Sequence, residues 1–291
     1  MSRLGSILKK AYLAVTSVAV IAALTGSTYA WFSANRITST NLVSSRTDQM
    51  NVSLLLGTSP GGSAGGESEV AIARVNPDAA KEMMPVSTAD LTTFFVSPYT
   101  DEMKATTFLK VENEKNFYHG RIYMQAVAEG MPDGTKVRLY LDESAYGGGA
   151  ILQNAPGYAR NALRIGLKFD NGNPLILRAS EDANPTEGRF YNTVIDGQLI
   201  ESNIVLVQSG EKIAAVADPS VFYRTYCVGE NGLPVDGTVK PLIDLELNRE
   251  YVLDIYVYLE GCDPDCTNVL SLDTFDFHLG FYGIVTEEAD G

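Results

Sequence analysis

The sequence is poor in the residue types on which metal-dependent catalysis usually depends. It contains two histidines, three cysteines and one tryptophan among 291 residues. A zinc peptidase of the HExxH class needs two histidines four positions apart on one helix, with a glutamate as the base. His119 and His278 are far apart in the sequence, and neither begins that pattern. These shortages argue against zinc proteolysis.

Other catalytic signatures are missing as well. The pattern of a phosphate-binding loop does not occur, because the glycines at 147–149 lack the lysine and the hydroxyl residue that must follow. No pattern points to a catalytic triad. The sequence therefore predicts a protein that is not an enzyme and that needs no cofactor.

Basic residues are scarce relative to acidic ones. The chain carries 22 lysines and arginines against 36 aspartates and glutamates, which gives a formal net charge of −14. Such a surface repels the phosphate backbone of nucleic acids, so the sequence predicts no nucleic-acid partner. The acidity would keep an exported protein soluble, and in a second interpretation some carboxylates collect divalent cations outside the cell.

Disulfide bonds are too few to hold this chain together. Three cysteines allow at most one intrachain bridge, but 291 residues can bury a core without one. Cys227 stands alone between Tyr226 and Val228, and we expect it to be a small buried apolar side chain.

The sequence does have the composition of a β-rich domain. It contains 15 tyrosines and 11 phenylalanines, with 26 glycines and 12 prolines to supply turns. Apolar and polar residues alternate with period two over 251–259 and 275–281, which is typical of strands with one face in a core. Shorter alternating runs occur at 50–56, 107–111, 121–127, 137–141, 164–169 and 200–207.

Many short strands separated by turn signals indicate two antiparallel sheets packed face to face. The sequence predicts an all-β fold, a jelly-roll-like antiparallel β-sandwich with long loops and a few short helices, as one domain over 50–291. Short helices are considered near Ala79–Met84 and Ala159–Leu163. The glycine-rich run at 58–68 has the composition of a flexible loop or linker.

The first thirty residues have the layout of a secretory signal peptide. Basic residues end at Lys10, an apolar stretch runs to Leu24, and small residues precede a cleavage point after Ala30. A retained membrane anchor is the alternative, because about 20 apolar residues can span a bilayer. The sequence predicts a secreted protein whose mature chain begins near Trp31. Its polar residues 31–49 can be extended but cannot form a core of their own.

Three stretches resemble the TasA/camelysin family of secreted biofilm-matrix and cell-surface fibre proteins. They are the signal junction TYAWFSANRITSTN at 28–41, FLKVENEKNFYHGRIYMQA at 108–126 and YVLDIYVYLEGCDPDC at 251–266. The chain departs from the family at 44–56, which reads SSRTDQMNVSLLL where the family has a stretch like Ala-Gly-x-Leu-Asp-Leu. The resemblance implies a jelly-roll domain exported by a dedicated (SipW-type) signal peptidase to the matrix or surface of a bacterium.

The resemblance also implies assembly into fibres, in which the N-terminal segment of one subunit completes a sheet of the next. An extended segment without its own core gains main-chain hydrogen bonds by pairing with an open sheet edge. The partners would be copies of this chain, with an accessory matrix protein as a further candidate. A frayed terminus, or an edge strand of its own domain, is the alternative. The candidate anchors of the donated strand are Trp31, Phe32, Ile37, Leu42 and Val43.

Two other functions are compatible with the sequence. A monomeric adhesin or binding module could present Tyr256, Tyr258 and Tyr282 as an exposed aromatic platform. A secreted metallopeptidase is the third, because camelysin-like proteins have been classed in that way.

The loop GCDPDCT at 261–267 is the most distinctive local feature. Cys262 and Cys266 could close a small disulfide ring outside the cell, or could remain two thiols. Asp263 and Asp265 are candidate Ca²⁺ ligands, and a purely structural loop is the alternative.

Overall fold

The structure is a computed structural model. It describes residues 36–37, 42–48, 52–75, 85–96, 109–111, 114, 116–131, 135–145, 151–153, 157–170, 172–181, 193–195, 198–200, 204–209, 212–217, 219–235, 237–261, 263, 266 and 274–286. The predicted signal peptide and the first candidate helix, Ala79–Met84, lie outside these residues. No helix in the described part of the chain is long and apolar enough to cross a membrane.

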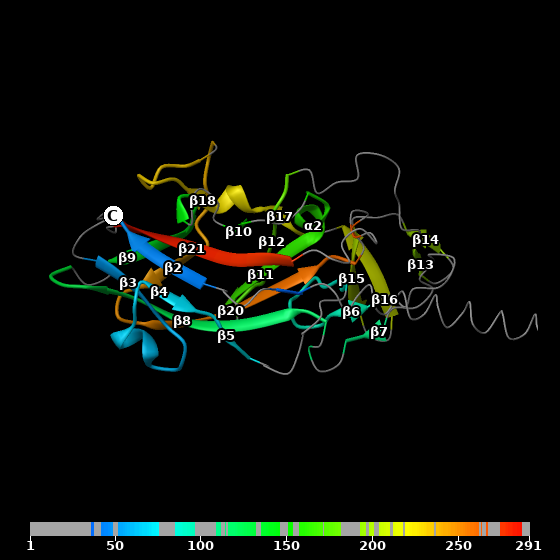
Figure 1. Cartoon of the computed structure of the whole chain (residues 1–291), viewed down its shortest axis with the longest axis horizontal. Helices are drawn as coiled ribbons and strands as arrows, with labels where there is room; N and C mark the ends of the chain where they lie inside the picture. The colour runs from blue at the N-terminus through cyan, green and yellow to red at the C-terminus, as the bar shows by residue number, and fades with distance from the viewer. Residues whose placement is uncertain are drawn as a thin grey trace, which may run out of the picture.

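The chain folds as an all-β sandwich of two large sheets, as predicted (Figure 1). The main path of the first sheet is β18 (Cys227–Val228), β9 (Lys136–Asp142), β21 (Thr274–Thr286), β2 (Leu42–Thr47) and β4 (Glu69–Ala71). Off this path, β1 (Arg36–Ile37) and β10 (Ile151–Gln153) pair with β21, and β19 (Ile243–Glu246) pairs with β9.

The second sheet follows the order β17 (Val221–Phe222), β12 (Leu175–Arg178), β11 (Leu163–Phe169), β20 (Glu250–Leu259), β8 (Tyr118–Ala128) and β3 (Val52–Gly57), with β5 (Ala73–Arg74) also paired to β8. Both sheets are mixed. Most pairings are antiparallel, but β1 and β2 each run parallel to β21, β12 to β17, and β18 to β9.

Smaller elements complete the described chain. Three further pairs are β6 (Phe95–Val96) with β7 (Leu109–Lys110), β13 (Thr193–Ile195) with β14 (Gln198–Ile200), and β15 (Ile204–Ser209) with β16 (Lys212–Ala217). The helical segments are η1 (Gly62–Gly65), α2 (Gly157–Ala162) and η3 (Tyr223–Tyr226). The single strand predicted at 200–207 was wrong, because Ile200 ends β14 and a separate strand, β15, begins at Ile204.

The period-two pattern of β20 correctly predicted which of its residues face the space between the sheets. Along β20 the alternate residues from Tyr251 to Leu259 pack between the sheets against Leu279 and Phe281 of β21. Cys227 is also fully buried there, as expected for a small apolar side chain. Burial of this continuous apolar layer is the main source of stability, at about 25 cal/mol per Å² of apolar surface removed from water.

The predicted aromatic platform is absent, because its members are buried. Tyr256 and Tyr258 do point to the outer face of the second sheet, but they are 8% and 0% exposed. The segment around Leu91 and Phe94 covers them, with Phe94 stacked on Phe117 at 3.8 Å between ring centroids. On the other sheet, Tyr282 is only 4% exposed. Alternation identified the outward faces but not the loops that cover them.

The glycine-rich run at 58–68 is a folded loop and not a linker. It contains η1 and returns to β3, where Leu56 and Glu67 exchange main-chain hydrogen bonds of 2.9 and 3.2 Å. The loop holds the carboxylate of Glu250, which accepts a hydrogen bond of 2.9 Å from the Gly61 amide and one from the Ser63 hydroxyl. A Cβ atom on residue 66 would lie 2.0 Å from the Leu56 oxygen. Glycine at this position therefore allows the loop backbone to approach β3 closely.

Candidate functional site

The first long strand of the chain lies beside its last strand. β2 runs parallel to β21, from Leu42 opposite His278 to Thr47 opposite Gly283, and the two lie side by side in Figure 1. On its other side β2 pairs antiparallel with β4, so that Ser44 is opposite Glu69. The N-terminal strand therefore occupies a slot between two strands of its own domain.

β2 contributes little apolar surface to the core. All six of its residues are described, and Val43 alone is an apolar side chain fully buried between the sheets. The inward Ser45 is polar, and its hydroxyl donates to the Leu54 oxygen at 2.6 Å. β2 is thus held largely by main-chain hydrogen bonds and polar side chains.

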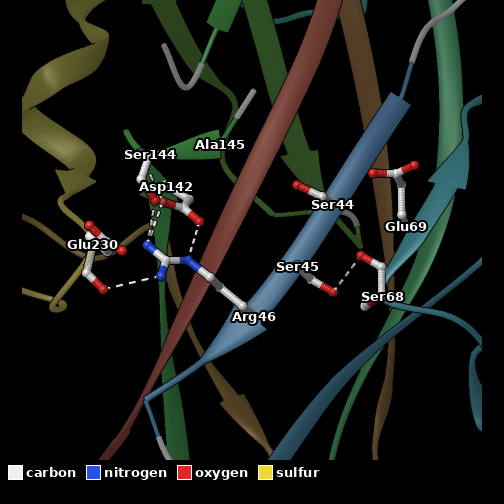
Figure 2. A pocket seen from close by; sticks show the side chains of 9 residues that line it. All are labelled: Ser44, Ser45, Arg46, Ser68, Glu69, Asp142, Ser144, Ala145 and Glu230. Atoms are coloured by element: carbon white, nitrogen blue, oxygen red, sulfur yellow. Dashed lines mark hydrogen bonds and ion pairs between the residues drawn. The ribbon is translucent and has the colours of Figure 1, made fainter. Parts of the chain in front are cut away.

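The outward face of β2 carries an arginine that reaches across the sheet. Figure 2 shows the side chain of Arg46 crossing β21 towards Asp142 and Ser144, whereas Ser45 points the opposite way. Arg46 donates to Asp142 from two nitrogens, Nε to Oδ2 and Nη2 to Oδ1, the second at 2.8 Å. Two parallel bonds of this kind match the fork of a guanidinium to a carboxylate and fix its orientation.

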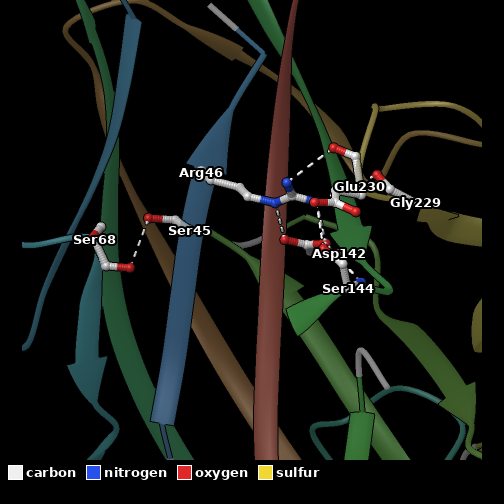
Figure 3. A network of polar contacts seen from close by, with 7 residues as sticks. All are labelled: Ser45, Arg46, Ser68, Asp142, Ser144, Gly229 and Glu230. Atoms are coloured by element: carbon white, nitrogen blue, oxygen red, sulfur yellow. Dashed lines mark hydrogen bonds and ion pairs between the residues drawn. The ribbon is translucent and has the colours of Figure 1, made fainter. Parts of the chain in front are cut away.

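The remaining donors of Arg46 are also used. Its Nη2 donates to the Ser144 hydroxyl at 2.6 Å, and its Nη1 donates to the Glu230 main-chain oxygen at 3.1 Å (Figure 3). The guanidinium lies 4.5 Å from the ring centroid of Tyr282, the residue opposite Arg46 on β21. The hydrogen bond to Asp142 raises the pKa of Arg46. One side chain of β2 is therefore recognised by β21, the end of β9 and the 229–230 turn.

An open pocket of about 430 Å³ surrounds this arginine. Nine residues from β2, β4, the end of β9 and the 229–230 turn line it (Figure 2): Ser44, Ser45, Arg46, Ser68, Glu69, Asp142, Ser144, Ala145 and Glu230. Asp142 is already occupied, because its Oδ1 also accepts from the Ser144 amide at 3.0 Å and the Ser144 hydroxyl at 2.7 Å. The carboxylate of Asp142 in this pocket is therefore bound by protein groups on several sides.

The structure locates only part of the predicted donor-strand set. Leu42 and Val43 lie in β2, with Val43 fully buried and Leu42 partly buried. Ile37 lies in β1 and pairs with Phe275 of β21. Trp31 and Phe32 lie outside the described residues. Sequence reasoning missed Arg46, although it is the one basic residue within 42–48.

Asp263 of the GCDPDCT loop has a structural partner. Its carboxylate accepts a hydrogen bond of 2.8 Å from Arg164, and both side chains are 0% exposed. A cation therefore already neutralises this carboxylate, which supports the structural interpretation of the loop. Cys266 is buried, whereas Cys262 and Asp265 lie outside the described residues. The disulfide and the Ca²⁺ site stay predictions.

His119 lies in a charged cluster near the start of β8, on the same face of the second sheet as Tyr256. Its Nδ1 is 2.9 Å from Glu114 and its Nε2 is 3.1 Å from Asp254, which also pairs with Arg121 at 2.7 Å. Burial lowers the pKa of His119, but the hydrogen bonds to Asp254 and Glu114 outweigh it, so the pKa is raised. Within the described part of the chain, no group of three or more His, Cys, Asp or Glu side chains could hold a metal ion.

Comparison with known proteins gives no relative. No protein-family model matches the chain, and no curated protein or solved structure matches it significantly.

Proposed function

We propose that this chain is a structural subunit of secreted bacterial fibres, located in a biofilm matrix or at the cell surface, and that it assembles by exchanging its N-terminal strand. The observation that carries the proposal is the position of β2, parallel to β21 and between β21 and β4. A β2 strand from a second copy could make the same contacts. The family resemblance of the signal junction supports the same mechanism.

The energetics of β2 favour exchange. The strand buries one apolar side chain, Val43, so its withdrawal removes little apolar surface of β2 itself from the core. Its hydrogen bonds and its Arg46 contacts would be regained in the slot of a neighbour. Only four residues separate Thr47 at the end of β2 from Val52 at the start of β3, in the other sheet. Short connections of this kind favour the swapping of an element between copies.

The alternative of a monomeric binding module loses its main support. Its proposed platform, Tyr256, Tyr258 and Tyr282, is buried. No other observation on the described surface favours that function over assembly.

A pair of introduced cysteines tests the proposal. Ser44 and Glu69 are opposite each other, and the adjacent pair carries the hydrogen bond from the Ser45 amide to the Ser68 oxygen at 2.7 Å. Ser44 and Glu69 thus form a non-hydrogen-bonded pair, in which side chains lie closest. Fibres of residues 31–291 carrying Ser44→Cys and Glu69→Cys should, after oxidation, give a ladder of linked chains on non-reducing gels.

The matched control is a cysteine pair that does not involve β2. Arg138 on β9 and Asp244 on β19 are opposite each other and exposed, so Arg138→Cys with Asp244→Cys should crosslink within one chain in monomer and fibre alike. Linked monomers alone from the Ser44 and Glu69 variant in filaments would refute exchange of β2. Absence of filaments under negative stain would refute self-assembly of the purified chain.

A further inference from the structure

Nothing in the connectivity of β2 and β21 fixes their register. Hairpin strands are aligned by their turn, whereas these parallel strands come from opposite ends of the chain. The burial of Val43 forbids a slip of one residue, because such a slip turns every side chain to the other face. A slip of two residues keeps the faces and displaces only one buried apolar side chain, Val43, so contacts on the outward face must add to the discrimination.

Arg46 distinguishes the observed register from a two-residue slip, together with the hydrogen bond of 3.2 Å that the Asp48 carboxylate accepts from the Val285 amide. Its outward neighbours on the same face are Ser44 and Asp48. A slip in one direction would place Ser44 near Asp142, and a serine is too short to reach it. A slip in the other direction would bring Asp48 towards Asp142, and two carboxylates repel each other. The wrong registers are thus disfavoured by loss of contact in one case and by repulsion in the other.

Contacts that do not involve β2 help to hold the receiving side in place. Asp142 is held by the Ser144 amide at 3.0 Å and by the Ser144 hydroxyl at 2.7 Å, and its side chain is 5% exposed. The Glu230 oxygen and the Tyr282 ring complete a site for one guanidinium. Lysine cannot reproduce a two-bonded fork, so the site is specific for arginine.

We infer that Arg46 and Asp142 form the recognition pair of strand exchange: the Asp142 pocket of one copy selects the β2 strand of a second copy by its arginine and sets its register. This inference rests on the proposed function. It adds the residue pair that decides which strand is accepted and in which alignment.

Charge reversal of the two residues in separate chains tests the inference. Arg46→Glu places a carboxylate opposite Asp142, and Asp142→Lys places a cation opposite Arg46. Each variant alone should lose at least tenfold in the fraction of chain that sediments as fibres. An equal mixture should recover assembly, because each slot then meets a strand of opposite charge supplied by the other variant.

The double variant, Arg46→Glu with Asp142→Lys in one chain, is the matched control. It should assemble alone, because every junction restores an oppositely charged pair. If the double variant assembles but the mixture does not, the two residues interact within one chain, and the inference is overturned. If both single variants assemble like the unmodified chain, the pair does not select strands, while the Ser44 and Glu69 crosslinks still report whether β2 is exchanged.

A second set of variants covers the case in which a reversed charge prevents folding, as judged by circular dichroism. Arg46→Gln and Asp142→Asn keep nearly the same size and add no charge. Their mixture has one native kind of junction, in which the Arg46 strand of the Asp142→Asn chain meets the Asp142 pocket of the Arg46→Gln chain. It should therefore stop at heterodimers in analytical ultracentrifugation. Fibres in that mixture, or in either neutral variant alone, would overturn the inference.

Discussion

Two arginine–aspartate pairs occupy contrasting places in this sandwich. Arg164 and Asp263 are sealed in the protein, with both side chains 0% exposed. Arg46 and Asp142 lie at an open pocket, where the Arg46 side chain is 35% exposed. A sealed pair is costly to break because its partner is left as a buried charge, whereas an open pair can be released to water. We therefore expect similar chemistry to give a permanent contact in one place and a contact that can be released in the other.

The largest difference in the free energy of unfolding should appear when one residue of each arginine–aspartate pair is removed. Asp263→Ala leaves the Arg164 guanidinium buried without its carboxylate, and we expect a loss of about 3–5 kcal/mol in the free energy of unfolding. Urea denaturation measures this loss. Replacing both residues, Arg164→Met with Asp263→Leu, should restore much of it. A double variant as unstable as Asp263→Ala would show that the charge is not the cause.

Loss of a buried apolar side chain should likewise destabilise the protein more in β20 than in β2. Leu253→Ala in the centre of β20 should cost about 2–5 kcal/mol, because it leaves a cavity between the sheets. Val43→Ala in β2 should cost about 1–3 kcal/mol, since fewer atoms are removed. Equal losses in urea denaturation would mean that β2 is as deeply integrated as β20.

The open pair should contribute little to stability and should respond to salt. Arg46→Ala is expected to cost about 0–1 kcal/mol in the unfolding of the monomer, because the guanidinium is partly solvated and the Asp142 carboxylate, although only 5% exposed, keeps its hydrogen bonds from Ser144. In 1 M salt the difference from the unmodified chain should shrink, since the Debye length falls to about 3 Å. The cost of Asp263→Ala should not change with salt. A large, salt-independent cost for Arg46→Ala would show that the Arg46–Asp142 pair behaves like the buried Arg164–Asp263 pair.

The smallest effect expected is a pH dependence at His119. Its pKa is raised above 6.5 by the hydrogen bonds to Asp254 and Glu114, which outweigh burial. The imidazolium therefore contributes stability that is fully present below pH 6.5 and is lost as the pH rises through the raised value. As the pH rises above 6.5, the melting temperature of the unmodified protein should fall relative to that of the His119→Gln variant. A constant difference between the two proteins would contradict the raised pKa.

The strands with strong alternation could be predicted from sequence, whereas for β2 the sequence predicted only an extended segment and not its partner. Alternation along β20 is a local property, so it identified both the strand and its core face. β2 reads LVSSRT, with polar residues on both faces, and its partner β21 lies more than 200 residues later. The importance of Arg46 depends on that distant pairing. The burial of Tyr256 likewise depends on a segment around Phe94 that no local pattern assigns to this face.

The loop between β3 and β4 has a consequence for protein engineering. Its composition, TSPGGSAGGES, invites the insertion of an epitope tag or a fluorescent fusion. Yet a Cβ atom on Gly57 would lie 2.5 Å from the Gly62 carbonyl carbon, and one on Gly66 would meet the Leu56 oxygen. An insertion there would also separate Glu250 from the Gly61 and Ser63 donors that it binds. The stretch that most resembles a spacer is thus among the poorest places to add one.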